Sequence, residues 1–542
     1  MRNKFLYFSL FWSAVLFICF YSCSKTVDLS DHGPYVDVPD VAIHFLNSRP
    51  EPADGMPGDE ITFKVKGLKD LSGFQFFVNQ VEASVITFTD SLVTIKLPDS
   101  VSTGTVSILS KEGQYYYGPV MKIDGKVSID ATFDIGSGTD GQINQIIPSG
   151  VNNLVAVGVF TDFKGQKASG AVNNIVQFSK TGGFVASSAE GGAGGIVSSI
   201  VQMNNSSQFL IGGSFGSYND ISGLNNLTKL NSNLSIDSTI VTLINPDTAA
   251  HPENSQDTVG TFNGGVSGSL VKMFYDSKSD KYIGIGNFDK YIDYFYGRSE
   301  KNTYLTNVTR ISNFVRFDAD GLLDSTYNFD PNLTVNKRVL NGYITDGIQL
   351  SNGNIVAVGS FTSYKDHPAH GIVVLSAGMN AEMDDAFMQN IGSGADGDIY
   401  KITYNAIQHK IILTGKFKNF NGHSANGIVV LNEDGSTDDK FVFGKLEGGS
   451  VNFAAQLDNG LMIVSGTFEK YKNYIRQGFM ILTPEGNLAA GYNNTGSFTG
   501  QINGIMEMKN TLSEPCVLLY GYINLFDNSK ANNIVRISFN EN

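Results

Sequence analysis

The feature that most constrains the fold of this chain is a short pattern that occurs seven times: glycine, any residue, phenylalanine, two further residues and an aromatic residue. Only the last copy departs at the third position, where it has Ile523. The glycines of neighbouring copies are 51 to 56 residues apart, except for two intervals of 73 residues. The copies are GVFTDF (158–163), GSFGSY (213–218), GNFDKY (286–291), GSFTSY (359–364), GKFKNF (415–420), GTFEKY (466–471) and GYINLF (521–526). Self-similarity at such a period predicts a repeat architecture.

Each copy lies between two apolar runs, such as KIILT before it and GIVVL after it. A turn sequence follows, for example NEDG (432–435), and then an element of the form D-x-x-aromatic, for example DDKF (438–441). These are short β-rich runs bounded by Gly, Asn and Asp, without helical periodicity. Four strands in a unit of this length predict one β-propeller blade per copy. We expect the aromatic residues to fill the spaces between blades, and the glycine to permit a bulge or a close backbone approach.

The two ends of the repeat region indicate how a ring would close. DATF (130–133) precedes the first copy, whereas no such element follows the last one. We therefore expect residues 127–133 to supply the outermost strand of the seventh blade, which removes open sheet edges. The glycine pattern and the D-x-x-aromatic element together resemble the delta-60 type β-propeller repeat, over roughly residues 127–540. The expected domain, residues 127–542, is a seven-bladed β-propeller closed by an N-terminal strand.

Residues 39–124 have a different pattern, with short alternating strands such as EITFKVKG (60–67) and VTIKLP (93–98). Strands of this length at this spacing predict a small immunoglobulin-like β-sandwich. The order PGDEITFKVKG, NQVEASV, VTIKLP and STGTVSI resembles an IPT/TIG domain. Such domains commonly act as spacers beside a membrane anchor or another domain. The whole chain is therefore expected to be all-β.

The first residues resemble a bacterial lipoprotein signal. Arg2 and Lys4 precede an apolar run at 5–21, and Cys23 stands where lipidation follows cleavage. We expect a signal peptide over residues 1–22 and a tether over 23–38. Phe20 departs from the leucine that the motif prefers, so an uncleaved membrane anchor and plain secretion remain alternatives.

Composition excludes several kinds of partner and site. The formal net charge is −14 and there is no basic stripe, so nucleic acid is an unfavourable partner. Of three cysteines, only Cys516 lies in the expected folded body, which leaves no disulfide framework and no cysteine metal site. No cofactor motif is recognisable.

The candidate catalytic and metal-binding residues have simpler interpretations. His367 and His370 form an H-x-x-H, but NGHSANG stands at the same place one repeat later, which favours a turn over zinc. DADGLLD (318–324) resembles a calcium loop only loosely, and hairpin turn chemistry explains it better. The carboxylate pairs Asp384/Asp385 and Asp438/Asp439 belong to the repeated D-x-x-aromatic element, which indicates a structural task. The expected catalytic and metal sites are therefore none.

Two insertions account for the long intervals, one at 241–262 and one at 292–307. They would flank one blade on the same face, which suggests a built site or interface. The second insertion carries the candidate ligand- or partner-binding residues: Tyr294, Phe295, Tyr296, Arg298 and Tyr304. Exposed aromatic residues with an arginine make sugar platforms or interaction hot spots. The alternative is that they pack the loop onto the propeller rim.

The combination of a lipoprotein signal, a TIG-like domain and a delta-60 propeller resembles surface lipoproteins of Bacteroidetes-type bacteria. That resemblance implies TonB-dependent outer-membrane transporters and SusD-like lipoproteins as partners. The expected function is non-catalytic: binding an oligosaccharide or peptide nutrient, docking on the transporter complex, or both. The expected location is the outer membrane, lipid-anchored and exposed at the cell surface. A propeller hydrolase or lyase and a structural or adhesive envelope protein are the alternatives.

Overall fold

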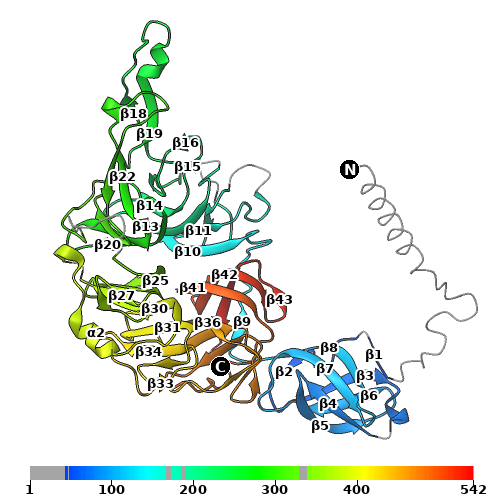
Figure 1. The fold of residues 1–542 in the computed structure, drawn as a ribbon. Helices are drawn as coiled ribbons and strands as arrows, with labels where there is room; N and C mark the ends of the chain where they lie inside the picture. Colours follow the sequence, from blue (N-terminus) through cyan, green and yellow to red (C-terminus); the bar gives the residue numbers. More distant parts are fainter. Residues whose placement is uncertain are drawn as a thin grey trace, which may run out of the picture.

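The computed structural model describes residues 43–46, 48–71, 73–166, 172–185, 191–328, 339–376 and 378–540. Within these ranges the structure is all-β apart from short helical turns and one helix, α2 (Asp385–Ile391). An N-terminal sheet unit lies beside the last sheets of a β-propeller (Figure 1). The predicted fold class is confirmed. The predicted signal segment and tether lie outside the described residues.

The N-terminal unit contains eight strands in the order β1-β3-β6-β5-β4-β7-β8-β2. Their side chains alternate as predicted: in β3 the buried residues are Ile61, Phe63 and Val65, with more exposed residues between them. These residues share one core with Phe76 and Ile108, which lie on two strands farther along the same strand order. The strands are β1 (His44–Phe45), β2 (Asp54–Gly55), β3 (Glu60–Lys66), β4 (Phe74–Val78), β5 (Val81–Phe88), β6 (Leu92–Lys96), β7 (Gly104–Ser110) and β8 (Tyr115–Ile123).

Each copy of the repeat forms a sheet of its own, with three antiparallel strands in most cases. The sheets of the first four copies are β10 (Gln142–Ser149), β11 (Asn153–Val159), β12 (Ile175–Ser179); β13 (Ile196–Gln202), β14 (Phe209–Ser214), β17 (Leu227–Leu230); β20 (Ser269–Asp276), β21 (Lys281–Asn287), β24 (Phe314–Phe317); and β25 (Tyr343–Gln349), β26 (Ile355–Ser360), β29 (Ile372–Leu375). The others are β30 (Asp398–Asn405), β31 (Lys410–Lys416), β34 (Ile428–Asn432); β36 (Val451–Gln456), β37 (Met462–Gly466), β40 (Phe479–Leu482); and β41 (Thr499–Lys509), β42 (Pro515–Phe526), β44 (Ile534–Phe539). The first strands contact one another in chain order, and β41 contacts β10, so they form a closed inner ring.

The repeated glycine has the same function in every sheet. It lies in the second strand opposite a bulge in the first strand, as for Gly415 opposite the shift between Ile399 and Lys401. A Cβ atom on any of the seven glycines would lie 2.0 to 2.3 Å from a carbonyl oxygen of the first strand. Real Cβ atoms do not approach so closely, so both predicted reasons for the glycine, the bulge and the close approach, apply together.

The bulges also link the blades. The extra residue of four bulges donates a side-chain hydrogen bond to the first strand of the next sheet, at 2.7 to 3.0 Å. One of these bonds runs from Asn503 of the last sheet to the carbonyl oxygen of Ile143 in the first sheet. The ring is therefore closed by the same contact that joins three other pairs of neighbouring blades.

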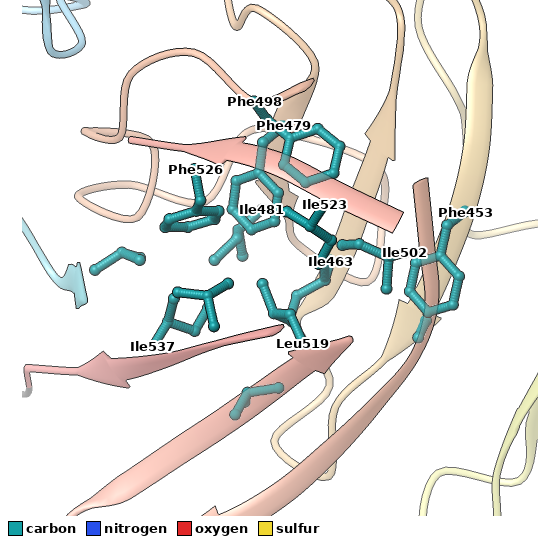
Figure 2. Close-up of a cluster of buried hydrophobic side chains, with 14 of the residues drawn as sticks. Phe453, Ile463, Phe479, Ile481, Phe498, Ile502, Leu519, Ile523, Phe526 and Ile537 are labelled. Carbon is teal, nitrogen blue, oxygen red and sulfur yellow. The ribbon is translucent and has the colours of Figure 1, made fainter. Parts of the chain in front are cut away.

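The aromatic residues of the repeat are buried between sheets, as predicted. Phe361 and Tyr364, for example, pack against Ile283 and Ile285 of the preceding blade. Where the second aromatic is tyrosine, its hydroxyl donates to a backbone carbonyl of the following turn, as from Tyr364 to Ala381 at 2.9 Å. Figure 2 shows the core between the last two blades, where Ile523 takes the place of the usual phenylalanine and packs with Phe479.

The fourth strand differs from the prediction in six of the blades. In six sheets the outer position is a single bridge, such as Leu431↔Thr437. In the last sheet it is a strand, β9 (Val127–Ile129), which pairs with β44. The predicted closure by an N-terminal strand is therefore confirmed.

Candidate functional site

The two insertions fold into two hairpins that together form an arm extending from the propeller (Figure 1). The first hairpin consists of β18 (Ser238–Thr242) and β19 (Gln256–Gly260). The second consists of β22 (Lys290–Tyr294) and β23 (Thr306–Arg310) and lies between the second and third strands of the third sheet. We call these four strands and their connecting turns the arm.

The hairpins of the arm contact each other near their ends. The backbone N–H of Ile244 in the first donates to the carbonyl oxygen of Ser299 in the second, at 2.8 Å. The hydroxyl of Tyr304 donates to a carboxylate oxygen of Asp257 at 2.6 Å. These bonds join segments that are about 50 residues apart in sequence, so the two insertions form one structure.

Three of the five candidate binding residues pack inside the arm. The rings of Tyr294 and Tyr296 are stacked with centroids 5.4 Å apart, and Tyr304 meets both edge-on, at 5.7 and 5.3 Å. The Tyr294 hydroxyl accepts a hydrogen bond from Asn225 at 2.9 Å. Burial, followed by the hydrogen bond to Asp257, raises the pKa of Tyr304 well above its ordinary value. The three half-buried rings pack against one another within the second hairpin, and the Tyr304 hydroxyl links that hairpin to the first, so they are not a free aromatic platform.

The other two candidates face solvent. Phe295 is 45% exposed and Arg298 is also exposed. Sequence reasoning missed the apolar residues that accompany them. Exposed aliphatic residues on the same arm are Ile240, Ile244, Leu305 and Val308. Their alternation with threonine and asparagine on short strands was the available signal, because a buried strand would pair its apolar residues with a core.

The closed inner ring carries three charged residues at equivalent positions, each directly after the bulge of its first strand. These are Lys272, Asp346 and Lys401. Lys401 and Asp346 form an ion pair at 3.1 Å, and Asp346 is almost fully buried. Burial lowers the pKa of Lys272, with Asp346 opposing and Lys401 reinforcing the effect. The repeat pattern did not indicate this group, because the equivalent positions of the other first strands hold uncharged residues: Gln145, Ser199, Phe453 and Gly504.

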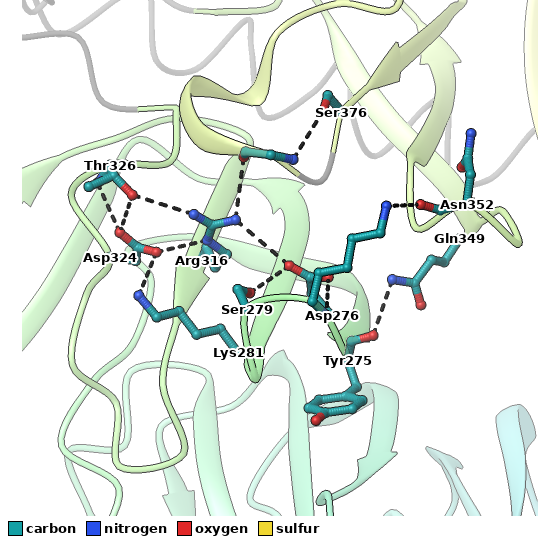
Figure 3. A network of polar contacts seen from close by, with 12 residues as sticks. Tyr275, Asp276, Ser279, Lys281, Arg316, Asp324, Thr326, Gln349, Asn352 and Ser376 are labelled. Atoms are coloured by element: carbon teal, nitrogen blue, oxygen red, sulfur yellow. Dashed lines mark hydrogen bonds and ion pairs between the residues drawn. The ribbon is translucent and has the colours of Figure 1, made fainter.

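The carboxylates of the D-x-x-aromatic element are bound within the blades. Asp324 accepts hydrogen bonds from Arg316 Nε at 2.8 Å and from Lys281 at 2.7 Å (Figure 3). The guanidinium of Arg316 also lies over the ring of Tyr327, which is the aromatic residue of the same D-x-x-aromatic element. Asp384 caps helix α2, and Asp438 pairs with Lys410 at 2.6 Å. These contacts support the structural interpretation of the element.

The histidines and the aspartate considered as metal ligands also have contacts that explain them as parts of strands and turns. His367 pairs in a two-residue strand with the aromatic residue of its repeat, and His423 does the same one blade later. Asp318 accepts backbone N–H bonds from Asp320 and Leu322, which is turn chemistry. Within the described ranges, no group of three or more His, Cys, Asp or Glu side chains could hold a metal ion. Cys23 lies outside the described residues.

Two family models match parts of the chain. Residues 22–119 match a domain of unknown function (DUF5008), and residues 410–441 match a domain of unknown function described as a beta-propeller (DUF5122). The first match falls on the N-terminal unit and its leader, and the second on the fifth sheet. No curated protein matches.

Solved structures match the chain only at low similarity. The WD40 beta propeller domain of Doa1 is 12% identical with a TM-score of 0.38, over 77% of this chain and 98% of that one. An auxiliary nutrient binding protein from Bacteroides ovatus is 11% identical with a TM-score of 0.27, over 91% and 97%. A protein of unknown function from Bacteroides thetaiotaomicron is 12% identical with a TM-score of 0.24, over 92% and 98%. In the part of the chain that the structure describes, no helix is long and apolar enough to cross a membrane.

Proposed function

We propose that this protein is a non-catalytic, lipid-anchored cell-surface protein whose arm docks onto a partner in an outer-membrane nutrient-uptake complex. The observation that carries the proposal is the arm itself. Two insertions, each absent from the other repeats, meet to form one projection with exposed apolar side chains. A blade needs neither insertion to close, so their joint structure favours recognition over folding.

The arm has both tyrosines that pack within it and apolar side chains that face solvent, and this combination supports docking of a protein. Tyr294, Tyr296 and Tyr304 pack against one another in the second hairpin. The hydrogen bond from Tyr304 to Asp257 joins this hairpin to the first. Such pre-formed contacts lower the entropy that binding must overcome. Phe295 and Leu305 are neighbours across the second hairpin, where the Phe295 N–H donates to the Leu305 carbonyl oxygen. An exposed apolar pair beside Arg298 has the composition of an interaction hot spot.

The rest of the proposal comes from the sequence. Lipidation at Cys23 would anchor the chain, residues 23–38 would act as a tether, and an IPT/TIG-like domain over 39–124 would space the propeller from the membrane. The partner class, a TonB-dependent transporter with its SusD-like lipoprotein, comes from the resemblance of the domain combination. An oligosaccharide or peptide is the cargo that such a complex would carry.

The anchor is tested by metabolic labelling with an alkyne-bearing palmitate. We expect the native chain to incorporate the label and Cys23→Ser to lose it together with membrane association. Labelling that persists in Cys23→Ser would exclude this site. A surface location is checked by protease treatment of intact cells.

Docking is tested by pulling down the tagged full-length protein from its native membrane in mild detergent and identifying what accompanies it. We expect stoichiometric recovery of a TonB-dependent transporter. The double variant Phe295→Ser/Leu305→Ser should lose the transporter while retaining its own melting temperature, since both side chains are exposed.

The matched control for the docking test is Ile407→Ser. Ile407 is 64% exposed on the turn between β30 and β31, far along the chain from the arm. It should retain the partner. Recovery of the protein alone, or equal loss in both variants, would overturn docking through the arm. Hydrolysis of an oligosaccharide by the purified protein would instead favour the enzyme alternative.

A further inference from the structure

A cleft of about 460 Å³ lies between the N-terminal unit and the sixth sheet. The N-terminal unit contributes Val101 and Ile123, and the sixth repeat contributes Tyr474, Arg476 and Leu488. The cleft is separate from the arm, which projects from the third sheet. Its properties therefore do not depend on the function proposed above.

Hydrogen bonds fix the two sides of the cleft relative to each other. The Asn494 side chain donates to the carbonyl oxygens of Ile123 and Val127 at 3.2 and 2.9 Å. The backbone N–H of Thr103 donates to the Asn494 carbonyl oxygen at 2.9 Å. A Cβ atom on Gly125 would lie 2.5 Å from the Asn494 side chain, so the approach requires glycine there. The hydrogen bonds of Asn494 therefore fix the positions of the two walls of the cleft relative to each other.

Arg476 is a departure from the repeat at this cleft. Its backbone N–H donates to the carbonyl oxygen of Glu469, seven residues earlier. The residues that make the same seven-residue backbone bond in other repeats are Ala369, Ala425 and Ala531, all buried. A blade therefore closes with alanine at this position, and the arginine of the sixth repeat serves something other than blade packing.

The Arg476 side chain is buried without a countercharge. It is only 6% exposed, and its Nη1 donates to the carbonyl oxygen of its neighbour Ile475 at 2.6 Å. Its Nε is buried with no hydrogen-bond partner, and none of the ion pairs among the described residues includes it. Burial lowers the pKa of Arg476 to about 10. Buried charges are normally paired, so the side chain lacks an anion.

The surroundings of Arg476 indicate what kind of anion would fit. Tyr474 is 45% exposed at the cleft, and the guanidinium lies 5.8 Å from its ring centroid. Lys472 adds a second cation at the edge. Asp99 and Asp124 also line the cleft, but the charges that act on Asp124 are Asp54, Lys122 and Asp59 of its own unit.

We propose that the cleft binds a small ligand through a carboxylate group, which Arg476 holds while the body of the ligand lies on the ring of Tyr474. A planar guanidinium fork matches a carboxylate, and an aromatic face accepts the flat side of a sugar or of a peptide group. The volume suits a ligand of one or two residues. An acidic sugar and a peptide C-terminus share this chemistry.

The proposal is tested by calorimetric titration of the full-length protein in mild detergent. The probes are sodium glucuronate against glucose, and an N-acetylated dipeptide against its C-terminal amide. We expect heat of binding from one or both carboxylates and from neither neutral analogue. Comparing the sugar pair of probes with the peptide pair distinguishes the two sources of the carboxylate.

Two variants decide whether Arg476 is responsible. Arg476→Ala restores the residue of the other repeats, so it should fold and melt at or above the native temperature, yet bind the carboxylate at least ~10-fold more weakly. Tyr474→Ala should weaken binding while leaving the preference for the charged probe. His423→Ala, the equivalent exposed position one blade earlier, should change nothing. Equal binding by Arg476→Ala and the native protein, or no response to any carboxylate, would overturn the proposal.

Discussion

Two buried arginines of the propeller have opposite surroundings. Arg536 lies at the seam between the first and last blades, where its Nε donates to Asp130 and its Nη2 to Thr132, both at 2.7 Å. Its guanidinium also lies 4.8 Å from the ring centroid of Phe133. Arg476 lies at the cleft, and its side chain makes one hydrogen bond, to the carbonyl oxygen of its neighbour Ile475.

This difference in hydrogen-bond partners indicates that Arg536 has a structural role, whereas folding does not explain the charge of Arg476. The seam arrangement is repeated in the third blade, where Arg316 meets Asp324, Thr326 and Tyr327 in the same way (Figure 3). The two buried arginines with a structural role thus each bond to the aspartate and threonine of a D-x-x-aromatic element. Arg476 has no such partner, which is why we assign it to a ligand.

The largest expected effect tests the seam. Asp130→Ala leaves Arg536 buried and uncompensated, so the free energy of unfolding should fall by about 3–5 kcal/mol. Urea denaturation of the full-length protein in detergent measures it. The control is Asp134→Ala, because the Asp134 side chain is 84% exposed in its ion pair with Lys164. Similar losses in both variants would contradict a structural role for the seam.

The second effect is the dependence of stability on pH. Burial alone would raise the pKa of Asp130, but hydrogen bonds from Thr132 and Arg536 outweigh it and lower that pKa. The stabilisation is therefore complete above the unfolded pKa of about 3.9 and is lost as pH falls below it. As pH falls below about 4, the unfolding free energy should fall more steeply for the native protein than for Asp130→Ala, whereas the two curves should be parallel between about pH 5 and 7. Curves that stay parallel below about pH 4 would contradict this.

The third effect has the opposite sign and tests the cleft. Arg476→Ala removes a buried charge that has no countercharge, so the ligand-free protein should gain about 1–2 kcal/mol of unfolding free energy. Urea denaturation measures it beside Asp130→Ala. A loss of stability instead would show that Arg476 is held by contacts that folding needs, and would remove the contrast with Arg536.

The smallest effect concerns a second side chain of the same blade. The Tyr471 hydroxyl donates to the carbonyl oxygen of Gly486 at 2.6 Å. The same hydroxyl accepts a hydrogen bond from the backbone N–H of Gly444 at 2.8 Å. Tyr471→Phe should cost about 1 kcal/mol, because two hydrogen bonds, each contributing about 0.5 kcal/mol at the low end of the usual range, are lost while the ring stays in place. Phe163, Phe420 and Phe526 already occupy this position in other repeats. A much larger loss in thermal denaturation would mean that the sixth blade differs from the others as a whole.

Much of the blade could be predicted because its interactions are local or repeated. The glycine pattern indicated both the bulge and the close approach, and the aromatic positions indicated the packing between blades. The spacing of the two insertions placed them on one face. The roles of individual arm residues could not be predicted, because Tyr294, Tyr296 and Tyr304 pack against one another while Phe295 does not, and composition cannot distinguish these cases.

The cleft was visible in the sequence only as an unexplained substitution. Aligning the repeats puts Arg476 where others have alanine, but alignment does not say what lies opposite. That depends on the N-terminal unit, whose Thr103 and Asn79 meet the sixth and seventh repeats almost 400 residues away.

By itself, the sequence determined the all-β class, the repeat and the strand that closes the ring. The period, the bulge and the turns each depend on residues within one unit of about 50 residues. Only the tertiary structure decided which charges are paired. Asp130 and Arg536 are 406 residues apart, and their hydrogen bond exists only when the ring closes. Electrostatic and packing free energies depend on distance in space, so the partner of a buried charge, or its absence, is a property of the folded chain.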